Sequence, residues 1–202
     1  MWEIITKGGW LMVPILLGSV IGLGVFLERL LALTRARVAP PGLGDEVRRL
    51  LVEQGEEAAL ERCKGSESSL GRVLAEGLAA RGRGRERQKE HLEEAGRREA
   101  ARLERYVGVL GIVASIEPLL GLLGTVVGMI AVFQRVVSAG VGDPAVLAEG
   151  IWAALITTAA GLTVAIPAFI AWRYLDTRVG DHLRGLEEEA LALVEAMEQE
   201  AA

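Results

Sequence analysis

Several threonines and one glutamate stand inside long apolar stretches of this sequence. Glu117 directly precedes Pro118 and Thr125 follows eight residues later, while Thr157 and Thr158 lie together in another apolar stretch. A hydroxyl in such surroundings can hydrogen-bond to water, to a proton carrier or to a neighbouring helix, and a carboxyl must be protonated, paired or in water. These residue types therefore indicate proton handling or close helix packing.

Residues for most covalent or metal-assisted chemistry are scarce. Cys63 is the only cysteine, which excludes an internal disulfide and a thiolate metal cluster, and His91 and His182 stand in separate charged stretches. Two separate histidines are too few for a histidine-based metal site and give little support to a catalytic triad. No phosphate-binding loop of the Gly-x-x-x-x-Gly-Lys-Ser/Thr type occurs. We expect no enzyme activity, no bound cofactor and no metal.

The apolar stretches are long enough to cross a bilayer. No ionisable side chain occurs in residues 8–27, 118–134 or 150–172, which are windows of 20, 17 and 23 residues, and a membrane helix needs about 20. A mean hydropathy of +0.34 with 25 glycines suits helices that pack through small residues in lipid. A soluble helical protein would have to bury all three windows within 202 residues. The sequence predicts an all-α integral membrane protein with three transmembrane helices and a helical cytoplasmic lobe.

Positive charge predicts the orientation. Of the 22 Lys and Arg residues, seventeen lie between Arg29 and Arg105, on one side of the predicted spans, and this side should be cytoplasmic. The expected segments are an outward N-terminus with the first span (1–28), a cytoplasmic lobe (29–106), the second span (107–137), a short outward loop (138–147), the third span (148–173) and a cytoplasmic tail (174–202).

The lobe and the tail should be helical. After a breaker at residues 39–44, helical patterns run over 45–60 and 66–81. From Arg85 the sequence is highly charged, with Glu93/Arg97 and Glu94/Arg98 at the spacing that supports an exposed helix, and we predict that this helix continues unbroken into the second span. In the tail, apolar residues in steps of four and three predict a seam that packs on a partner helix. The seam consists of Val179, Leu183, Leu186, Ala190, Leu193 and Met197.

A basic run at residues 81–87 could suggest binding of nucleic acid or anionic lipid. Acidic residues follow it, and residues 28–106 net only +2. We interpret the run as a solvated turn and expect no nucleic-acid partner.

Small residues form one face of the second span and one of the third. Such faces let helices approach closely, and they can also line a narrow polar interior. Close packing is the simpler interpretation, and a pore role for Thr125 and Thr158 is the alternative. The two faces consist of Gly121, Gly124, Thr125 and Gly128, and of Ala154, Thr157, Thr158, Gly161 and Ala165.

Each span also contains a proline. Pro14, Pro118 and Pro167 each lack an amide donor, so we expect kinks and unpaired carbonyls one turn earlier, at Trp10, Ala114 and Thr163.

Glu117 has two interpretations. A carboxyl at membrane depth is a candidate functional site. Alternatively, it lies close enough to the inner interface to extend toward water or to meet an arginine such as Arg105.

These residues resemble the ExbB/TolQ/MotA family of proton-channel motor subunits, and most closely its ExbB branch. The resemblance covers nearly the whole chain: residues 8–30 are similar to the family's first span, and 118–133 and 150–168 to its second and third. It implies a multi-pass protein of the bacterial inner membrane with a periplasmic N-terminus and a cytoplasmic C-terminus, and protons as the coupling ion. Thr125 and Thr158 match the family's pore threonines.

The resemblance also implies partners. The expected assembly is a homo-oligomer, a pentamer, in membrane lipid around a single-span ExbD-like protein whose aspartate carries protons, and it drives a TonB-like protein. TolQ, which serves envelope constriction, shares the same physics, whereas a MotA-like stator would have a fourth span. A structural scaffold whose small faces only pack is the alternative from a different class.

One departure concerns the membrane acid. The family's third span has a glutamate five positions before its threonine, where this chain has Ala153, and Glu117 stands where a small residue is usual. At about 1.5 Å per residue, Ala153 would lie about 7.5 Å outward of Thr158, and Glu117 about 12 Å inward of Thr125. We hypothesise that Glu117 supplies an acid at the inner mouth of the pore.

Overall fold

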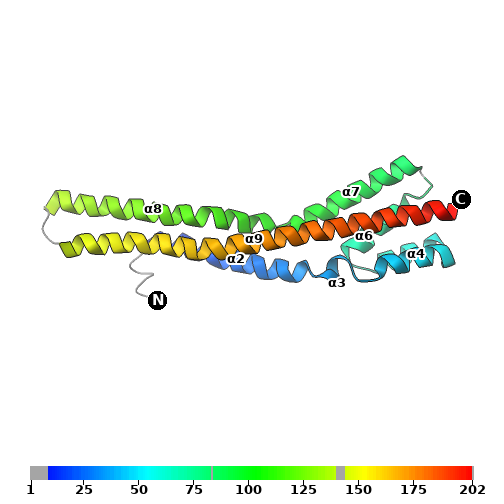
Figure 1. Ribbon diagram of the computed structural model, residues 1–202, viewed down its shortest axis with the longest axis horizontal. Helices are drawn as coiled ribbons and strands as arrows, with labels where there is room; N and C mark the ends of the chain where they lie inside the picture. The colour runs from blue at the N-terminus through cyan, green and yellow to red at the C-terminus, as the bar shows by residue number, and fades with distance from the viewer. Residues whose placement is uncertain (1–8, 83, 140–143, 202) are drawn as a thin grey trace. The chain divides into compact units, whose positions relative to one another are not determined.

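The computed structural model describes residues 9–82, 84–139 and 144–201. These residues divide into two compact units. The span unit comprises residues 1–28 and 106–174, and the lobe unit comprises residues 29–105 and 175–202. All regular elements of the described residues are helices (Figure 1), as the sequence predicted.

Three helices carry the span unit. They are α2 (Met12–Ala32), α8 (Val107–Ala139) and the first part of α9 (Pro144–Ala201), and each is long and apolar enough to cross a membrane. In Figure 1, α8 and α9 run side by side through this unit, in yellow-green and yellow. Residues 140–143 of the expected outward loop and residues 1–8 of the expected N-terminus lie outside the described residues.

The lobe unit is built from short helices and one long one. They are α3 (Arg35–Val38), α4 (Leu43–Gln54), α5 (Glu56–Lys64), α6 (Ser69–Ala79) and α7 (Arg85–Glu104). The helix predicted over residues 45–60 is split at Gly55, whose φ of 89° is one that glycine adopts readily. Ser68 begins α6 as its N-cap, because its hydroxyl accepts a hydrogen bond from the Gly71 amide at 3.0 Å.

The second part of α9 supplies the predicted seam. Val179, Leu186 and Leu193 are buried, and Leu193 approaches α6 at Gly77. Gln88 of α7 donates to the sulfur of Met197 at 3.2 Å. The partner of the seam is therefore the chain's own lobe, and the third span continues into the tail as one helix, as expected.

The prediction of one continuous helix from Arg85 into the second span is wrong. Helix α7 ends at Glu104 and α8 begins at Val107. Arg105 has an extended ψ of 130°, and Tyr106 has a φ of 65°, in the left-handed region that bulky residues rarely adopt. No glycine or proline marks this break, so the sequence did not signal it.

Candidate functional site

Glycines bring α8 and α9 into backbone contact. A Cβ atom on Gly121 would lie 2.9 Å from the Thr158 Cα, and one on Gly161 would lie 2.5 Å from the carbonyl oxygen of Glu117. Further along, a Cβ on Gly128 would lie 2.9 Å from that of Ala154. Main-chain atoms cannot move aside as a flexible side chain can, so these positions admit only glycine without displacing the helices.

Two adjacent threonines fill the space that the α8 glycines leave. The Thr157 hydroxyl donates to the Ala154 carbonyl at 2.6 Å, and the side chain packs where a Gly124 side chain would be. Thr158 instead reaches across to α8, where its hydroxyl donates to the Gly121 carbonyl at 2.9 Å. This neutral hydrogen bond fixes the register of α9 against α8 without placing a charge in an apolar region.

Thr125 differs from these two threonines. It is half-buried, and its hydroxyl donates to the Leu122 carbonyl of its own helix at 2.7 Å. The close glycine contacts of the described residues do not involve it. Thr125 therefore remains available to a molecule outside the α8–α9 contact, whereas Thr157 is 2% exposed.

Glu117 lies in the core of the span unit. It is 2% exposed, and Oε2 makes no hydrogen bond within the described part of the chain. Its Oε1 lies against α2, only 1.8 Å from where a Cβ on Gly18 would be. The interpretation in which this side chain extends to the membrane interface does not match its burial.

Sequence reasoning missed the glycines of α2. Gly18 faces Glu117, and a Cβ on Gly22 would lie 3.6 Å from Val113 and 3.8 Å from Leu110, both on α8. The signal was present, because Gly18 and Gly22 are spaced as in the small-x-x-x-small pattern of packed membrane helices.

Pro14 acts differently from Pro118 and Pro167. Pro118 and Pro167 lie inside α8 and α9, as expected, and each leaves the carbonyl of the preceding turn without its helical donor. Pro14 lies in the first turn of α2, where the Trp10 carbonyl accepts from the Val13 amide at 3.1 Å. The expectation that Pro14 leaves the Trp10 carbonyl unpaired is wrong, since a turn at the helix start pairs it.

Aromatic residues mark one end of the α8–α9 pair. Trp172 packs edge-on against Phe169 at 5.8 Å between ring centroids, and the Arg173 guanidinium lies 5.8 Å from the Trp172 ring. A Cβ on Gly111 would lie 3.2 Å from the same ring. Tryptophan and arginine together are typical of the membrane–water interface.

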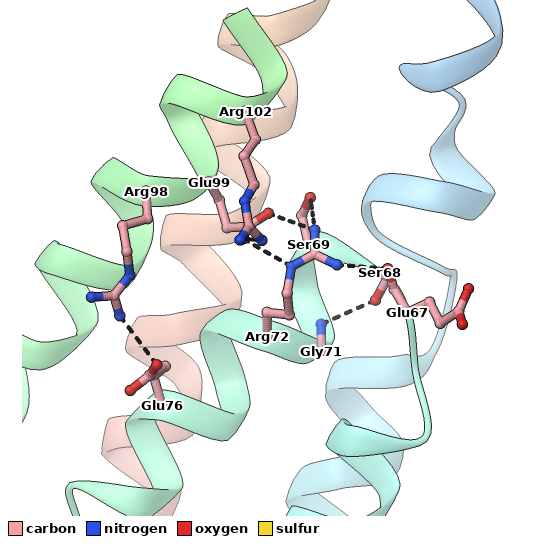
Figure 2. A network of polar contacts seen from close by, with 9 residues as sticks. All are labelled: Glu67, Ser68, Ser69, Gly71, Arg72, Glu76, Arg98, Glu99 and Arg102. Atoms are coloured by element: carbon pink, nitrogen blue, oxygen red, sulfur yellow. Dashed lines mark hydrogen bonds and ion pairs between the residues drawn. The ribbon is translucent and has the colours of Figure 1, made fainter. Parts of the chain in front are cut away.

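In the lobe unit, a charged network joins α6 to α7 (Figure 2). The Arg72 guanidinium donates two hydrogen bonds to the Glu99 carboxylate, at 2.8 and 2.7 Å, and Arg102 adds a third at 2.7 Å. Arg98 donates to Glu76 at 3.1 Å. The network crosslinks two helices by bidentate geometry, which orients them more strictly than a single ion pair does.

This network controls the ionisation of Glu99, whose side chain is 4% exposed. Burial opposes its ionisation, but hydrogen bonds from Arg72 and Ser69 outweigh this effect and lower the pKa of Glu99. By contrast, burial raises the pKa of the Cys63 thiol to about 11. Cys63 is therefore a neutral thiol at physiological pH, which fits a packing role.

The comparisons with known proteins concern both units. A sequence profile of the MotA/TolQ/ExbB proton channel family matches residues 65–188, which include α6 to α8 and most of α9. The chain belongs to this family. The glycines and threonines of the α8–α9 contact all lie within the matched part.

Several relatives share this family. An ExbB homolog of biopolymer transport from Methanothermobacter thermautotrophicus is 30% identical over 187 residues, 92% of this chain and 66% of that protein. The biopolymer transport protein ExbB-like 1 of Synechocystis is 35% identical over 172 residues, 84% of this chain and 68% of that protein. The Tol-Pal system protein TolQ of Haemophilus influenzae is 44% identical over 82 residues, 41% of this chain and 36% of that protein.

The chain thus spans about two thirds of the length of the two ExbB-type relatives. Family membership and three apolar helices together make it a membrane protein of the MotA/TolQ/ExbB family. The matching family is described as one of proton channels.

Proposed function

We propose that this chain is an ExbB-like subunit of a proton-driven motor in the bacterial inner membrane. Copies of the chain form a homo-oligomeric ring, a pentamer, around a single-span ExbD-like partner that carries the proton. The motor energises a TonB-like protein and, through it, transport across the outer membrane. The chain itself needs no cofactor, since protons supply the energy.

The α8–α9 contact carries this proposal. Around Gly121 and Gly124, the helices are held by close contact with Thr158 and Thr157 and by the neutral hydrogen bond from Thr158 to the Gly121 carbonyl. These contacts involve no charged side chain that would trap a proton. Thr125 is left half-buried and bonded only within its own helix. In this proposal Thr125 and Thr158 line the proton route, while Thr157 packs α9 against α8.

The orientation follows from charge. Arginine is concentrated in the lobe, which supports a cytoplasmic position for the lobe and the tail and a periplasmic N-terminus. In this arrangement the ring reaches the TonB-like protein through its partner.

A TolQ-like role is the second candidate. The TolQ of Haemophilus influenzae shares 44% identity over 82 residues, a local identity above that of the two long ExbB-type matches. The same ring would then serve the Tol-Pal envelope system. Rescue of a strain that lacks its TonB-linked motor, compared with one that lacks its Tol-linked motor, separates the two roles.

The experiment that tests the proton route is Thr125→Val. Valine keeps the shape of threonine but removes the hydroxyl, so we expect proton-driven activity to fall at least about tenfold while assembly is retained. Thr125→Ser restores the hydroxyl and should retain most of the activity.

Thr163→Val is the matched control. Thr163 is an exposed threonine whose hydroxyl donates to its own helix, at 2.7 Å from the Ala159 carbonyl. It should leave activity unchanged. Equal activity of the Thr125→Val and Thr163→Val proteins would contradict the proposed route and favour a structural scaffold.

A further inference from the structure

We propose that Glu117 forms a proton-binding site enclosed in the core of each span unit, where α2 and α8 hold its carboxyl in the neutral form. The carboxyl exchanges its proton when this contact opens. The site goes beyond the proposed motor function, because it requires neither the ring nor the partner. It also differs from an acid at a pore mouth, since Glu117 is 2% exposed within a single chain.

The Glu117 carboxyl fits closely against α2. Oε1 lies 1.8 Å from where a Cβ on Gly18 would be, so the acid occupies the volume that this glycine leaves. On the other side, Gly161 of α9 packs against the Glu117 main chain. Three helices thus enclose the residue, and a second copy of the chain cannot reach it without moving them.

No counter-charge faces the Glu117 carboxyl from the membrane stretches of α2, α8 and α9 that the structure describes. Each helix packed against Glu117 lacks titratable and charged side chains along the facing stretch, over residues 12–27 of α2 and 150–172 of α9. Within α8, Glu117 is the only such group in residues 107–134. An enclosed carboxylate without a partner is strongly disfavoured, as any buried unpaired ion is, whereas the neutral acid avoids that penalty.

Close to Glu117 in sequence, α8 has a backbone carbonyl in need of a hydrogen-bond donor. Pro118 follows Glu117 and has no amide hydrogen, so the Ala114 carbonyl, one turn earlier on α8, lacks its helical donor. A neutral carboxyl has an O–H to donate, and this carbonyl needs a donor. Oε2, which has no hydrogen bond to any described residue, is the oxygen available to carry the proton.

Release of the proton requires water. When α2 separates from α8, the carboxyl O–H bond breaks and the proton passes to an entering water molecule, which leaves the carboxylate behind. The reverse transfer restores the neutral acid and lets α2 close again. Protonation of Glu117 and the packing of α2 on α8 are in this way coupled.

Infrared spectroscopy of the full chain in lipid tests the protonation directly. At neutral pH, we expect a carbonyl-stretch band of a protonated carboxylic acid that shifts in deuterated water and is lost in Glu117→Gln. Glu99→Gln is the control that should keep the band, because the pKa of Glu99 is lowered by Arg72 and its carboxylate is ionised.

Three results would overturn the site. The absence of the band at neutral pH would show that Glu117 is ionised, and a band that never shifts in deuterated water would show a proton that does not exchange. A band that disappears when sodium is added at constant pH would assign the site to a sodium ion instead. None of these results bears on the Thr125 variants, so this inference can fail while the motor function stands.

A double-substitution cycle tests the geometry. Gly18→Ala should lower the melting temperature in detergent by about 5 °C or more, because the new methyl group meets the carboxyl. Glu117→Ala removes the carboxyl, so adding it to Gly18→Ala should restore most of the loss. Gly24→Ala is the matched control in the same helix, since nothing lies within 4 Å of a Cβ there. Equal effects of Gly18→Ala with and without Glu117 would contradict the enclosed site.

Discussion

The helices within the span unit and the helices within the lobe unit are held together by opposite means. In the span unit, helices meet where side chains are missing: Gly121 and Gly161 admit main-chain contact, and the cross-helix hydrogen bond from Thr158 is neutral. In the lobe unit, leucines fill the core, and charged groups such as Arg72 and Glu99 crosslink the helices. The difference follows from the solvent. In lipid, burying a leucine between helices gains no hydrophobic stabilisation and a charge is costly. In water, burying a leucine stabilises the fold and a charged side chain at the surface is readily solvated.

Gly161→Ala should have the largest effect, and it tests whether glycine contacts hold the span unit together. The new Cβ would lie 2.5 Å from the Glu117 carbonyl oxygen, so the helices must separate. We expect a loss of about 3 kcal/mol or a failure to fold, measured as thermal stability in detergent. Gly180→Ala, on the lobe part of the same helix with nothing within 4 Å of its Cβ, should be neutral or stabilising by up to about 1 kcal/mol. Similar losses for both variants would refute glycine-mediated contact.

Acid should weaken the lobe through Glu99. The pKa of this carboxyl is lower in the folded protein than in the unfolded chain, so its stabilising effect is complete above the unfolded value, about 4.3. That effect disappears as the pH falls through the lower folded value. Hydrogen exchange of α6 and α7 as a function of pH would measure it.

Glu99→Gln removes the same effect at neutral pH. We expect a loss of about 1–2 kcal/mol, reduced because Arg72 remains 42% exposed, and a flatter response to acid. The control is Glu93→Gln, whose pair with Arg97 is largely exposed and should contribute less than about 0.5 kcal/mol. An unchanged acid response in Glu99→Gln would show that other carboxyls control the lobe.

The smallest effect should come from Thr158→Val. It removes one neutral hydrogen bond to the Gly121 carbonyl, and such bonds between membrane helices contribute about 0.6 kcal/mol. Thermal stability should therefore barely change. A large loss of stability would mean that Thr158 holds α8 and α9 together as strongly as the glycines do. Glycine contacts would then not be the main cause of packing in the span unit.

The sequence predicted the parts of the fold that depend on local pattern. Charge-free windows revealed the three long helices, apolar spacing revealed the α9 seam, and the i,i+4 spacing revealed the pairs of Glu93 with Arg97 and Glu94 with Arg98. Each of these signals is carried by neighbours along one helix, where spacing determines which side chains meet.

The parts that depend on distant segments could not be read in the same way. Two contacts join residues far apart in the sequence: the fit of Gly18 to Glu117, and the pair of Arg72 with Glu99. The residues around each position do not indicate which distant residue it contacts. The break at Tyr106 was also hidden, because a residue with no turn preference adopts the left-handed conformation. The roles of Thr125, Thr158 and Glu117 remain predictions that the experiments above address.

The most direct test of the motor is the native mass of the tagged chain, expressed with its genomic neighbours and purified in mild detergent. The account predicts a closed homo-oligomeric ring that retains fewer copies of a single-span partner than of this chain. A well-behaved monomer without such a partner would contradict it, because a proton route between the chain and a partner needs both.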